Sequence, residues 1–366
     1  MSIKVRAAVI HGANRPMTIE TLEYEDLRGD QVLVKVEASG LCHSDLHIID
    51  GSAGHTEFPA VLGHEIGGVV IGCGPDVKTL ELGDHVVALF CPQCGECPNC
   101  KSGKTNICQH FCGEGQDASK LTWNGVEVAR PGGTGGFADH TILNESALAK
   151  VRKDAPLNRA FYTGCGVTTG VGAVMFTAKV EAGAKVIIFG LGGIGLNVVQ
   201  GARLAGASMV IGVDLNPARE DMARSLGVTH FINPADIEGD LAAHLIELTG
   251  GGADYCFECV GSTKLMEQAS AVSHPLWGVT TLVGVSPYGQ KIAAEPTDYL
   301  MGRKLQGTMF GGAKGRTDVP KVVDWYMNGE INIDDLVTHV LPLEQIDKGF
   351  EMMKRGEAIR TVLTFD

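Results

Sequence analysis

The chain has no run of about 18 apolar residues, the length that a membrane-spanning helix needs, so no membrane span is expected. It also lacks a surplus of basic residues, because 30 Lys and Arg stand against 43 Asp and Glu, which gives a net charge of −13. Phosphate contacts need clustered Lys and Arg, so nucleic acid is excluded as an expected partner. Lys4 and Arg6 interrupt the apolar N-terminus, which argues against a secretory signal and predicts a cytoplasmic protein.

No Gly/Ser-rich stretch marks a linker, although the 366 residues include 49 glycines. This length is large for a single core, and two domains are the default expectation. The 11 cysteines are an odd number in a chain without a secretory signal. Cysteines in that setting indicate reduced thiols and metal sites rather than disulfides.

Short β-type runs separated by Gly turns fill roughly the first 150 residues and predict an antiparallel, β-rich domain. After about residue 165, apolar runs that predict strands alternate with helical segments. Alternating strands and helices predict a parallel, doubly wound sheet, so the expected fold class is α/β. The predicted strands of this part are 185–189, 209–213, 230–232, 253–258 and 278–285, and the predicted helices are 196–205, 218–226, 241–248 and, in the tail, 320–328.

Four cysteines lie close together in the sequence, Cys94, Cys97, Cys100 and Cys108. Four thiolates at such spacing can close a tetrahedral zinc site by themselves. A site with four protein sulfurs leaves no position for a substrate, so we expect a structural zinc. Cys91 forms a second Cys-x-x-Cys with Cys94, and the spacing alone leaves its part open.

A second set of metal-ligand types is spread along the chain, at Cys42, His64 and Cys165. Two Cys and one His leave one corner of a tetrahedron free, which is the arrangement of a catalytic zinc. The sequence therefore predicts two zinc ions per chain, one structural and one catalytic.

A Gly-x-Gly-x-x-Gly turn, Gly190 to Gly195, follows the apolar run 185–189 and opens a predicted helix. Its glycines permit a tight turn, a close approach of pyrophosphate to the backbone, and close packing of helix on strand. Asp214 stands 19 residues after Gly195, at the end of the next predicted strand, where a carboxylate accepts from the ribose hydroxyls. NAD is thus favoured over NADP, although nearby Arg219 could accommodate a 2′-phosphate.

Together these motifs resemble the zinc-containing medium-chain alcohol dehydrogenases, in particular the vertebrate-type branch. The resemblance covers essentially the whole chain and keeps the order of the motifs. It rests on the cysteine lobe, the Gly turn and the segments 42–47, 63–68, 164–166, 310–312 and 356–361. It implies a Rossmann NAD-binding domain at 167–309. It also implies a β-rich, GroES-like catalytic domain at 1–166 and 310–366, with the structural-zinc lobe at 91–112.

The resemblance also implies residue roles. Cys42, His64 and Cys165 would ligate the catalytic zinc, whose fourth position takes water and then the alcohol oxygen. Asp45 would accept from the other ring nitrogen of His64, and Glu65 would lie behind the zinc and tune its field or take part in ligand exchange. The structural zinc would be held by the cysteines at 94, 97, 100 and 108, with Cys91 a spare thiol.

For the reaction, the same family pattern places Ser44 to take the alcohol proton and His47 to pass it to solvent through the cofactor ribose. Phe90 would form an apolar wall of the substrate pocket, and Trp123 could form another. Cys73, Cys112, Cys256 and Cys259 are interpreted as small buried hydrophobes. The cofactor-binding residues expected from the resemblance are His43, Thr169, Gly190, Gly192, Gly193, Ile194, Gly195, Asp214, Arg219 and Arg360.

Two positions depart from the family. His43 stands where many relatives carry an Arg that grips the pyrophosphate, so we hypothesise weaker, pH-sensitive NAD binding, with Arg360 supplying the remaining charge. The stretch 109–117 holds no Arg, whereas glutathione-dependent formaldehyde dehydrogenases are expected to show one there for the carboxylate of the thiol adduct. The sequence thus disfavours a thiol adduct and favours primary alcohols or aldehydes with an aliphatic or aromatic tail.

Two further functional classes were weighed against an exchanging NAD-dependent alcohol dehydrogenase. The stretch 40–45 also resembles nicotinoproteins, which keep NAD bound through turnover. A non-enzymatic zinc- and nucleotide-binding protein would not need Cys42, His64, Cys165, Ser44 and His47 together, which argues against that class. The resemblance further implies a homodimer, since relatives of this length are commonly dimers.

Overall fold

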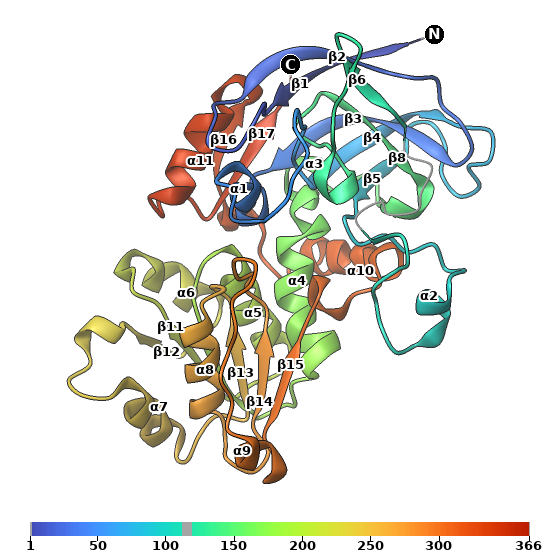
Figure 1. The fold of residues 1–366 in the computed structure, drawn as a ribbon. Coiled ribbons are helices and arrows are strands. Elements are labelled where there is room, and N and C mark those ends of the chain that lie inside the picture. Colours follow the sequence, from blue (N-terminus) through green and yellow to red (C-terminus); the bar gives the residue numbers. More distant parts are fainter. Residues whose placement is uncertain (1, 112–118, 366) are drawn as a thin grey trace. The chain divides into compact units, whose positions relative to one another are not determined.

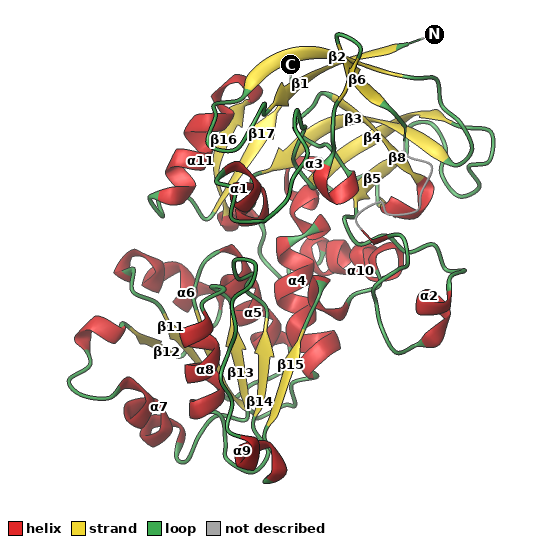
Figure 2. Ribbon diagram, viewed as in Figure 1, coloured by secondary structure: helices red, strands yellow, loops and turns green. Residues whose placement is uncertain are grey.

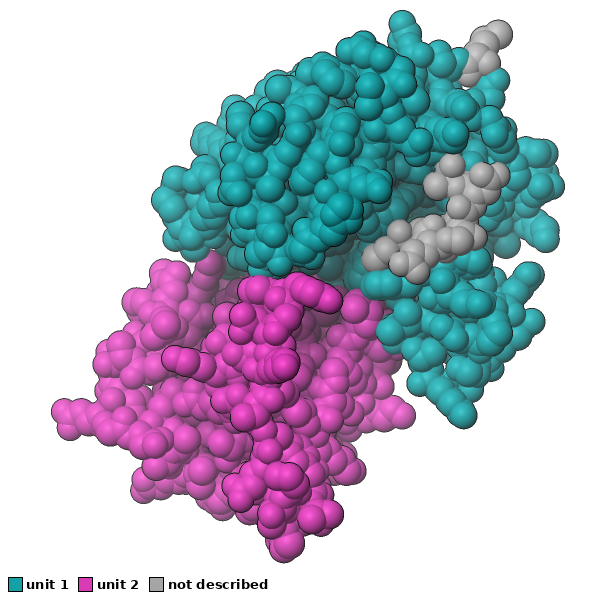
Figure 3. Space-filling model, viewed as in Figure 1, with its two compact units in different colours: residues 1–165, 314–366 teal, residues 166–313 magenta. Residues whose placement is uncertain are grey.

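The computed structural model describes residues 2–111 and 119–365 (Figure 1). The chain forms two compact units, residues 1–165 with 314–366 and residues 166–313, which we call the catalytic unit and the nucleotide unit (Figure 3). The divisions at 165/166 and 313/314 lie one and four residues from the expected domain boundaries at 166/167 and 309/310. No helix in the described ranges is long and apolar enough to cross a membrane.

The catalytic unit is built on a seven-stranded sheet in the order β16-β17-β3-β4-β5-β9, with β8 paired to β3. Its pairs are antiparallel except β16 with β17, which are parallel. The alternating residues Val32, Val34 and Val36 of β3 are buried, as the period-2 pattern predicts. Its strands are β3 (Gln31–Gly40), β4 (Glu65–Cys73), β5 (His85–Ala88), β8 (His140–Asn144), β9 (Leu148–Val151), β16 (Val337–Pro342) and β17 (Arg360–Thr364).

A smaller four-stranded sheet of this unit has the order β1-β2-β6-β7 (Figure 2). It shares a second apolar core with α11. Its strands are β1 (Ile3–Val9), β2 (Thr18–Tyr24), β6 (Leu121–Trp123) and β7 (Val126–Glu127). The helices of the unit are α1 (His43–Ile49), α2 (Pro98–Ser102), α3 (Leu157–Ala160), α10 (Gly315–Met327) and α11 (Ile346–Lys354), with the 3₁₀ turn η4 (Phe161–Gly164).

The nucleotide unit holds a six-stranded parallel sheet in the order β12-β11-β10-β13-β14-β15 (Figure 1). The central strand β10 is an almost continuous apolar run because both faces of a parallel sheet are covered. The strands are β10 (Lys185–Phe189), β11 (Met209–Val213), β12 (His230–Ile232), β13 (Tyr255–Glu258), β14 (Val279–Leu282) and β15 (Lys304–Gly307). The helices are α4 (Gly166–Gly172), α5 (Gly193–Leu204), α6 (Glu220–Leu226), α7 (Leu241–Thr249), α8 (Thr263–Val272) and α9 (Pro296–Leu300).

The predicted α/β fold, a doubly wound parallel sheet with a β-rich domain, is confirmed. The expected strands 185–189, 209–213 and 230–232 match β10, β11 and β12 to the residue. Two tail segments differ from expectation. Helix α10 begins at Gly315, five residues before Pro320, so Pro320 lies inside the helix, beyond the first turn in which proline is normally tolerated. Strand β17 joins the large sheet by pairing antiparallel with β3.

Candidate zinc and dinucleotide sites

Within the described residues, two groups of side chains could each hold a metal ion, and they contain the two expected ligand sets, with Glu65 added to the second. In each group the ligand atoms all lie within 4.8 Å of one another. Both groups lie in the catalytic unit, one in the lobe and one beside the large sheet. The members are Cys94, Cys97, Cys100 and Cys108 in the first group, and Cys42, His64, Glu65 and Cys165 in the second.

The lobe cysteines are arranged as a tetrahedral thiolate site requires. The Sγ atoms of Cys94 and Cys100 are 4.0 Å apart, and those of Cys97 and Cys108 are 3.8 Å apart. Four thiolates about 2.3 Å from a zinc ion would be about 3.8 Å from one another. Backbone N–H groups donate to these sulfurs. The N–H of Cys97 donates to Cys94 Sγ, and the N–H of Cys100 donates to Cys97 Sγ. The hydrogen bond from the Gln109 backbone lowers the pKa of Cys97 to about 6, which favours a thiolate.

Cys91 lies outside this group, buried, with its thiol 3.7 Å from the carbonyl oxygen of Asn106. Cys256 is also buried, while Cys73 and Cys259 are half-buried. Cys112 and most of the stretch 109–117 lie outside the described residues.

The second group gathers residues from three elements around one buried point. Cys42 follows β3 and is the N-cap of α1, His64 directly precedes β4, and Cys165 follows η4. All are at most 8% exposed. The turn before His64 needs a glycine, because Gly63 has φ +92° and a Cβ there would lie 2.5 Å from Phe137.

The two cysteines of this group shift each other's pKa in opposite directions. A hydrogen bond from Cys165 holds the pKa of Cys42 well below its ordinary value, and the same contact and burial raise the pKa of Cys165. Zinc binds cysteine as the thiolate, so a zinc ion here would replace the thiol protons of both cysteines. The donor set of two sulfurs and one imidazole nitrogen fits zinc.

Asp45 orients His64 in the manner expected. Its Oδ1 lies 3.3 Å from His64 Nδ1 and accepts from the Gly63 N–H at 3.1 Å, while Oδ2 accepts from the Cys42 N–H at 3.2 Å. With Nδ1 engaged, Nε2 is the His64 nitrogen left for a metal. One buried carboxylate therefore fixes two of the three expected ligands.

Glu65 and Arg360 form a buried ion pair at 3.3 Å. Burial raises the pKa of Glu65 to about 8, and the Arg360 charge opposes that shift. The Arg360 guanidinium also donates to the Leu41 carbonyl and to the Tyr162 hydroxyl. The resemblance implied that Arg360 binds the cofactor. In the structure its guanidinium contacts residues of the catalytic unit. Tyr162 was missed in the sequence, because a buried aromatic in an apolar run is indistinguishable from ordinary core.

The expected proton-relay residues lie on α1. The Ser44 hydroxyl is 3.8 Å from Cys42 Sγ, and His47 Nδ1 is 2.7 Å from the Ser52 hydroxyl. His43 is the first residue of the same helix, and partial burial lowers the pKa of its imidazole. A neutral imidazole attracts phosphate less than an arginine would, in line with the hypothesis of weaker NAD binding.

Aromatic rings border His64. The Phe90 ring meets the His64 ring edge-on, with centroids 5.7 Å apart, and Phe111 meets Phe90 in the same way at 6.2 Å. Phe111 was not singled out in the sequence, where nothing separates it from other lobe residues. The Trp123 indole instead donates to Glu20 and lies against His11, so it engages different partners from Phe90.

The Gly turn of the nucleotide unit has the expected geometry. Gly190 has φ +88°, a conformation that favours glycine, and its N–H donates to the Val213 carbonyl. A Cβ on Gly195 would lie 1.8 Å from the Gly190 oxygen, whereas a Cβ on Gly192 would meet nothing within 4 Å. Helix α5 starts here with no side-chain cap, which leaves the N–H groups of its first turn, including Gly193 and Ile194, for an anion.

Asp214 follows β11, and its carboxylate accepts from the N–H groups of Leu191 at 2.7 Å and Asn216 at 2.8 Å. It is therefore held beside the Gly turn, where the ribose of a bound nucleotide is expected. Arg219 ends a short 3₁₀ turn nearby and interacts electrostatically with Asp214. Thr169 is buried in α4 of the same unit.

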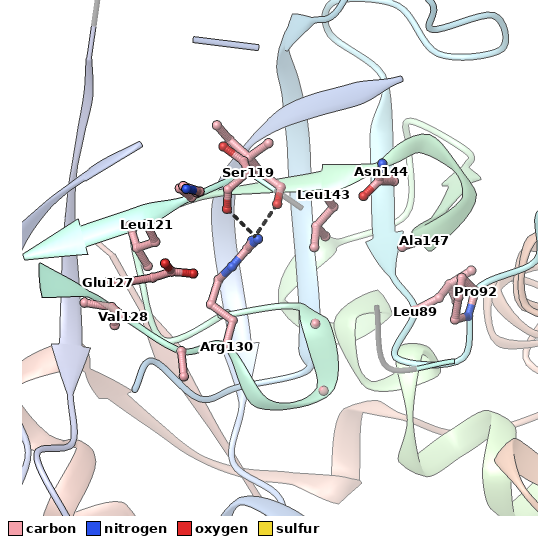
Figure 4. Close-up of a pocket in the computed structure, with 15 residues that line it drawn as sticks. Leu89, Pro92, Ser119, Leu121, Glu127, Val128, Arg130, Leu143, Asn144 and Ala147 are labelled. Atoms are coloured by element: carbon pink, nitrogen blue, oxygen red, sulfur yellow. Dashed lines mark hydrogen bonds between the residues drawn. The ribbon is translucent and has the colours of Figure 1, made fainter. Parts of the chain in front are cut away.

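A cavity of about 210 Å³ lies elsewhere in the catalytic unit, lined by Ser119, Arg130 and Asn144 among others (Figure 4). The Arg130 guanidinium donates to the carbonyl oxygens of Ile142 at 2.7 Å and Ser119 at 3.0 Å. None of the candidate metal-binding residues lines this cavity.

Comparison with known proteins identifies the class that this fold and these sites define. The family model "Alcohol dehydrogenase GroES-like domain" matches residues 28–153, and the model "Zinc-binding dehydrogenase" matches residues 193–328. The chain belongs to the zinc-containing medium-chain alcohol dehydrogenase family and is an NAD-dependent zinc alcohol dehydrogenase. The family resemblance, the enzyme class and the two cofactors, zinc and NAD, predicted from the sequence are thereby confirmed.

The relatives span the full chain. A class-3 alcohol dehydrogenase of Cereibacter sphaeroides is 47% identical, over 99% of this chain and 100% of its own. An S-(hydroxymethyl)glutathione dehydrogenase of Paracoccus denitrificans is 45% identical over the same shares. Among solved structures, benzyl alcohol dehydrogenase from Acinetobacter calcoaceticus matches with a TM-score of 0.91 and 30% identity, covering 100% of both chains.

Proposed function

We propose that the enzyme oxidises primary alcohols with an aromatic or aliphatic tail, and reduces the corresponding aldehydes, with NAD. The observation that carries this proposal is the Phe90 ring packed edge-on against His64, with Phe111 extending the apolar wall. An apolar wall directly beside a metal ligand favours an uncharged, ring-bearing or chain-bearing substrate.

The proposal assigns a role to each residue of the site, and the site geometry supports these roles. Cys42, His64 and Cys165 would hold the zinc, which would supply a Lewis acid for the alcohol oxygen, and the Gly turn would hold NAD, which would supply the hydride acceptor. Asp45 keeps His64 in the orientation that leaves Nε2 for the metal. The Ser44 hydroxyl, 3.8 Å from Cys42 Sγ, is placed to accept the alcohol proton. His47, on the next turn of α1, would carry that proton toward solvent.

A second candidate is a thiol-adduct formaldehyde dehydrogenase. It is favoured by the names of the relatives, two of which are a class-3 alcohol dehydrogenase and an S-(hydroxymethyl)glutathione dehydrogenase. The absence of an Arg from the sequence 109–117 and its acidic residues disfavour an anionic adduct. A third candidate, the nicotinoprotein, would be purified with nucleotide bound.

We predict the highest kcat/KM with benzylic alcohols in an assay of NADH formation that covers short aliphatic, long aliphatic, terpenoid and benzylic alcohols. Replacing Phe90 by Ala should lower kcat/KM for a benzylic alcohol about tenfold or more, because aromatic pairing and burial are lost. The kcat/KM for ethanol should change less. The assay is repeated with NADP, for which Asp214 predicts much weaker turnover.

The same assay discriminates the alternatives. Turnover only with formaldehyde and glutathione would contradict the proposal and establish the thiol-adduct activity. If Phe90→Ala lowers kcat/KM equally for ethanol and for a benzylic alcohol, Phe90 does not select the tail of the substrate. Nucleotide released on denaturing the purified protein, with no turnover on added NAD, would identify a nicotinoprotein.

We also propose a homodimer formed through the edge strand β15, and a cytoplasmic location. Large apolar side chains flank this edge and are exposed, with Leu300 at 85% and Met301 at 59%. Exposed apolar groups beside an unpaired strand edge are typical of an interface. Sedimentation equilibrium should give twice the chain mass, and Leu300→Glu should shift it toward the monomer. A monomeric wild-type protein would contradict this proposal.

A further inference from the structure

Three buried side chains, Tyr162, Arg360 and Glu65, contact one another in series. Glu65, the last of them, lies beside Cys42, His64 and Cys165. The Tyr162 hydroxyl accepts from Arg360 Nη2 at 3.1 Å, and Arg360 Nη1 lies 3.3 Å from Glu65 Oε1. Tyr162 and Glu65 have no exposed surface, and Arg360 is 4% exposed. These contacts all lie within the catalytic unit.

Glu65 has two cations within its reach. In the described part of the chain, neither of its carboxylate oxygens accepts a hydrogen bond, and Arg360 is its ion-pair partner. One of its oxygens also lies within 4.8 Å of the ligand atoms of Cys42, His64 and Cys165. A buried carboxylate must be paired, and carboxylate oxygens are good zinc ligands. Glu65 can therefore satisfy its charge with Arg360 or with a metal at this set.

Arg360 is held by Tyr162 and by the Leu41 carbonyl. The guanidinium lies over the Tyr162 ring, 4.3 Å from its centroid, and donates to the hydroxyl of the same residue. Its other fixed contact is the Leu41 carbonyl. Tyr162 is held in turn by η4, where its ring stacks on that of Phe161. The guanidinium is thus held from one side by an aromatic face and a hydroxyl.

We propose that Tyr162 is a positioning residue that holds Arg360 against Glu65 and thereby keeps the Glu65 carboxylate out of the zinc coordination sphere. The fourth coordination position then stays open for the alcohol. This inference rests, like the proposed function, on zinc bound by Cys42, His64 and Cys165. It differs in assigning the openness of the site to a residue that touches neither metal nor substrate.

The test uses the Co(II)-substituted full-length enzyme, with imidazole as the probe of the open position, read from the visible cobalt spectrum. Tyr162→Phe keeps the ring and removes the hydroxyl, so Arg360 loosens and Glu65 competes for the metal. We expect the imidazole Kd to rise about tenfold, the change that loss of one hydrogen bond to a charged group produces. The KM for alcohol should rise with it, while kcat changes less.

Two further variants make the result specific. Glu65→Gln combined with Tyr162→Phe should restore the wild-type imidazole Kd, because the competing carboxylate is gone. Tyr24→Phe is the matched control, since Tyr24 is another buried tyrosine of this unit whose hydroxyl contacts an arginine, Arg130. It should bind imidazole as the wild type does.

Unchanged imidazole binding in Tyr162→Phe would overturn the inference. A weakening that persists in the double variant would also overturn it, because Tyr162 would then act through packing rather than through Glu65. A wild-type protein that takes up cobalt only in the lobe would overturn the proposed function as well, which separates that failure from a failure of the Tyr162 inference alone.

Discussion

Cys42→Ala will leave one zinc per chain and lower kcat/KM for any alcohol by on the order of a thousandfold or more. Cys42 supplies one of only three expected protein ligands. Losing a residue that merely hydrogen-bonds to a ligand already lowers metal affinity or activity about 10–100-fold. The lobe zinc should stay, because its four cysteines form a separate group. Metal analysis together with the NADH assay measures both effects.

Cys73→Ala is the matched control for that substitution. Cys73 ends β4 in the same unit, and its thiol lies 3.9 Å from the Leu80 carbonyl, outside both metal-binding groups. This variant should keep two zincs and near wild-type turnover. A Cys42→Ala protein that retains both zincs, or that retains turnover, would contradict the assignment of Cys42 as a ligand of the catalytic zinc.

The second large effect is expected at the Gly turn, where two glycines should fail in different ways. Gly192→Ala adds a methyl group into open space, so the protein should keep its melting temperature. The methyl would stand where pyrophosphate must approach, and the Kd for NAD should rise about tenfold to a hundredfold. NADH fluorescence titration and thermal unfolding measure the two quantities.

Gly195→Ala is the contrasting variant. Its Cβ would lie 1.8 Å from the Gly190 oxygen, so strand β10 and helix α5 must separate. We expect the melting temperature to fall by about 5 °C or more, along with loss of NAD binding. Wild-type NAD affinity in a stable Gly192→Ala protein would show that the pyrophosphate does not pass this turn.

The sequence predicted best those features that local chemistry determines. The cysteine lobe spans few residues and Cys is a preferred zinc ligand, so spacing predicted a zinc site there, while the family resemblance left Cys91 out of it. Five of the six strands of the nucleotide unit were predicted, because a covered parallel sheet favours continuous apolar runs. The Gly turn was recognised because strand, turn and helix are consecutive in the chain.

Features made by residues distant in sequence were harder to predict. Arg360 is an apparent phosphate-binding cation in the sequence, yet its contacts with Glu65 and Tyr162 depend on how β17 joins the large sheet. Phe111 belongs to the apolar wall beside His64 only through its contact with Phe90. Strand β15, Lys-Leu-Gln-Gly, was not expected, because a strand at the sheet edge needs no continuous apolar run.

Removing and restoring zinc tests most directly the central claim, that a zinc held by Cys42, His64 and Cys165 catalyses NAD-dependent alcohol oxidation. The native enzyme is treated with a chelator until one zinc per chain remains, assayed for NADH formation with benzylic alcohol, and assayed again after zinc is added back. We predict that turnover falls in proportion to the zinc removed by the chelator and recovers fully when zinc is added back. Turnover that persists with one zinc, or that never depends on NAD, would contradict the account.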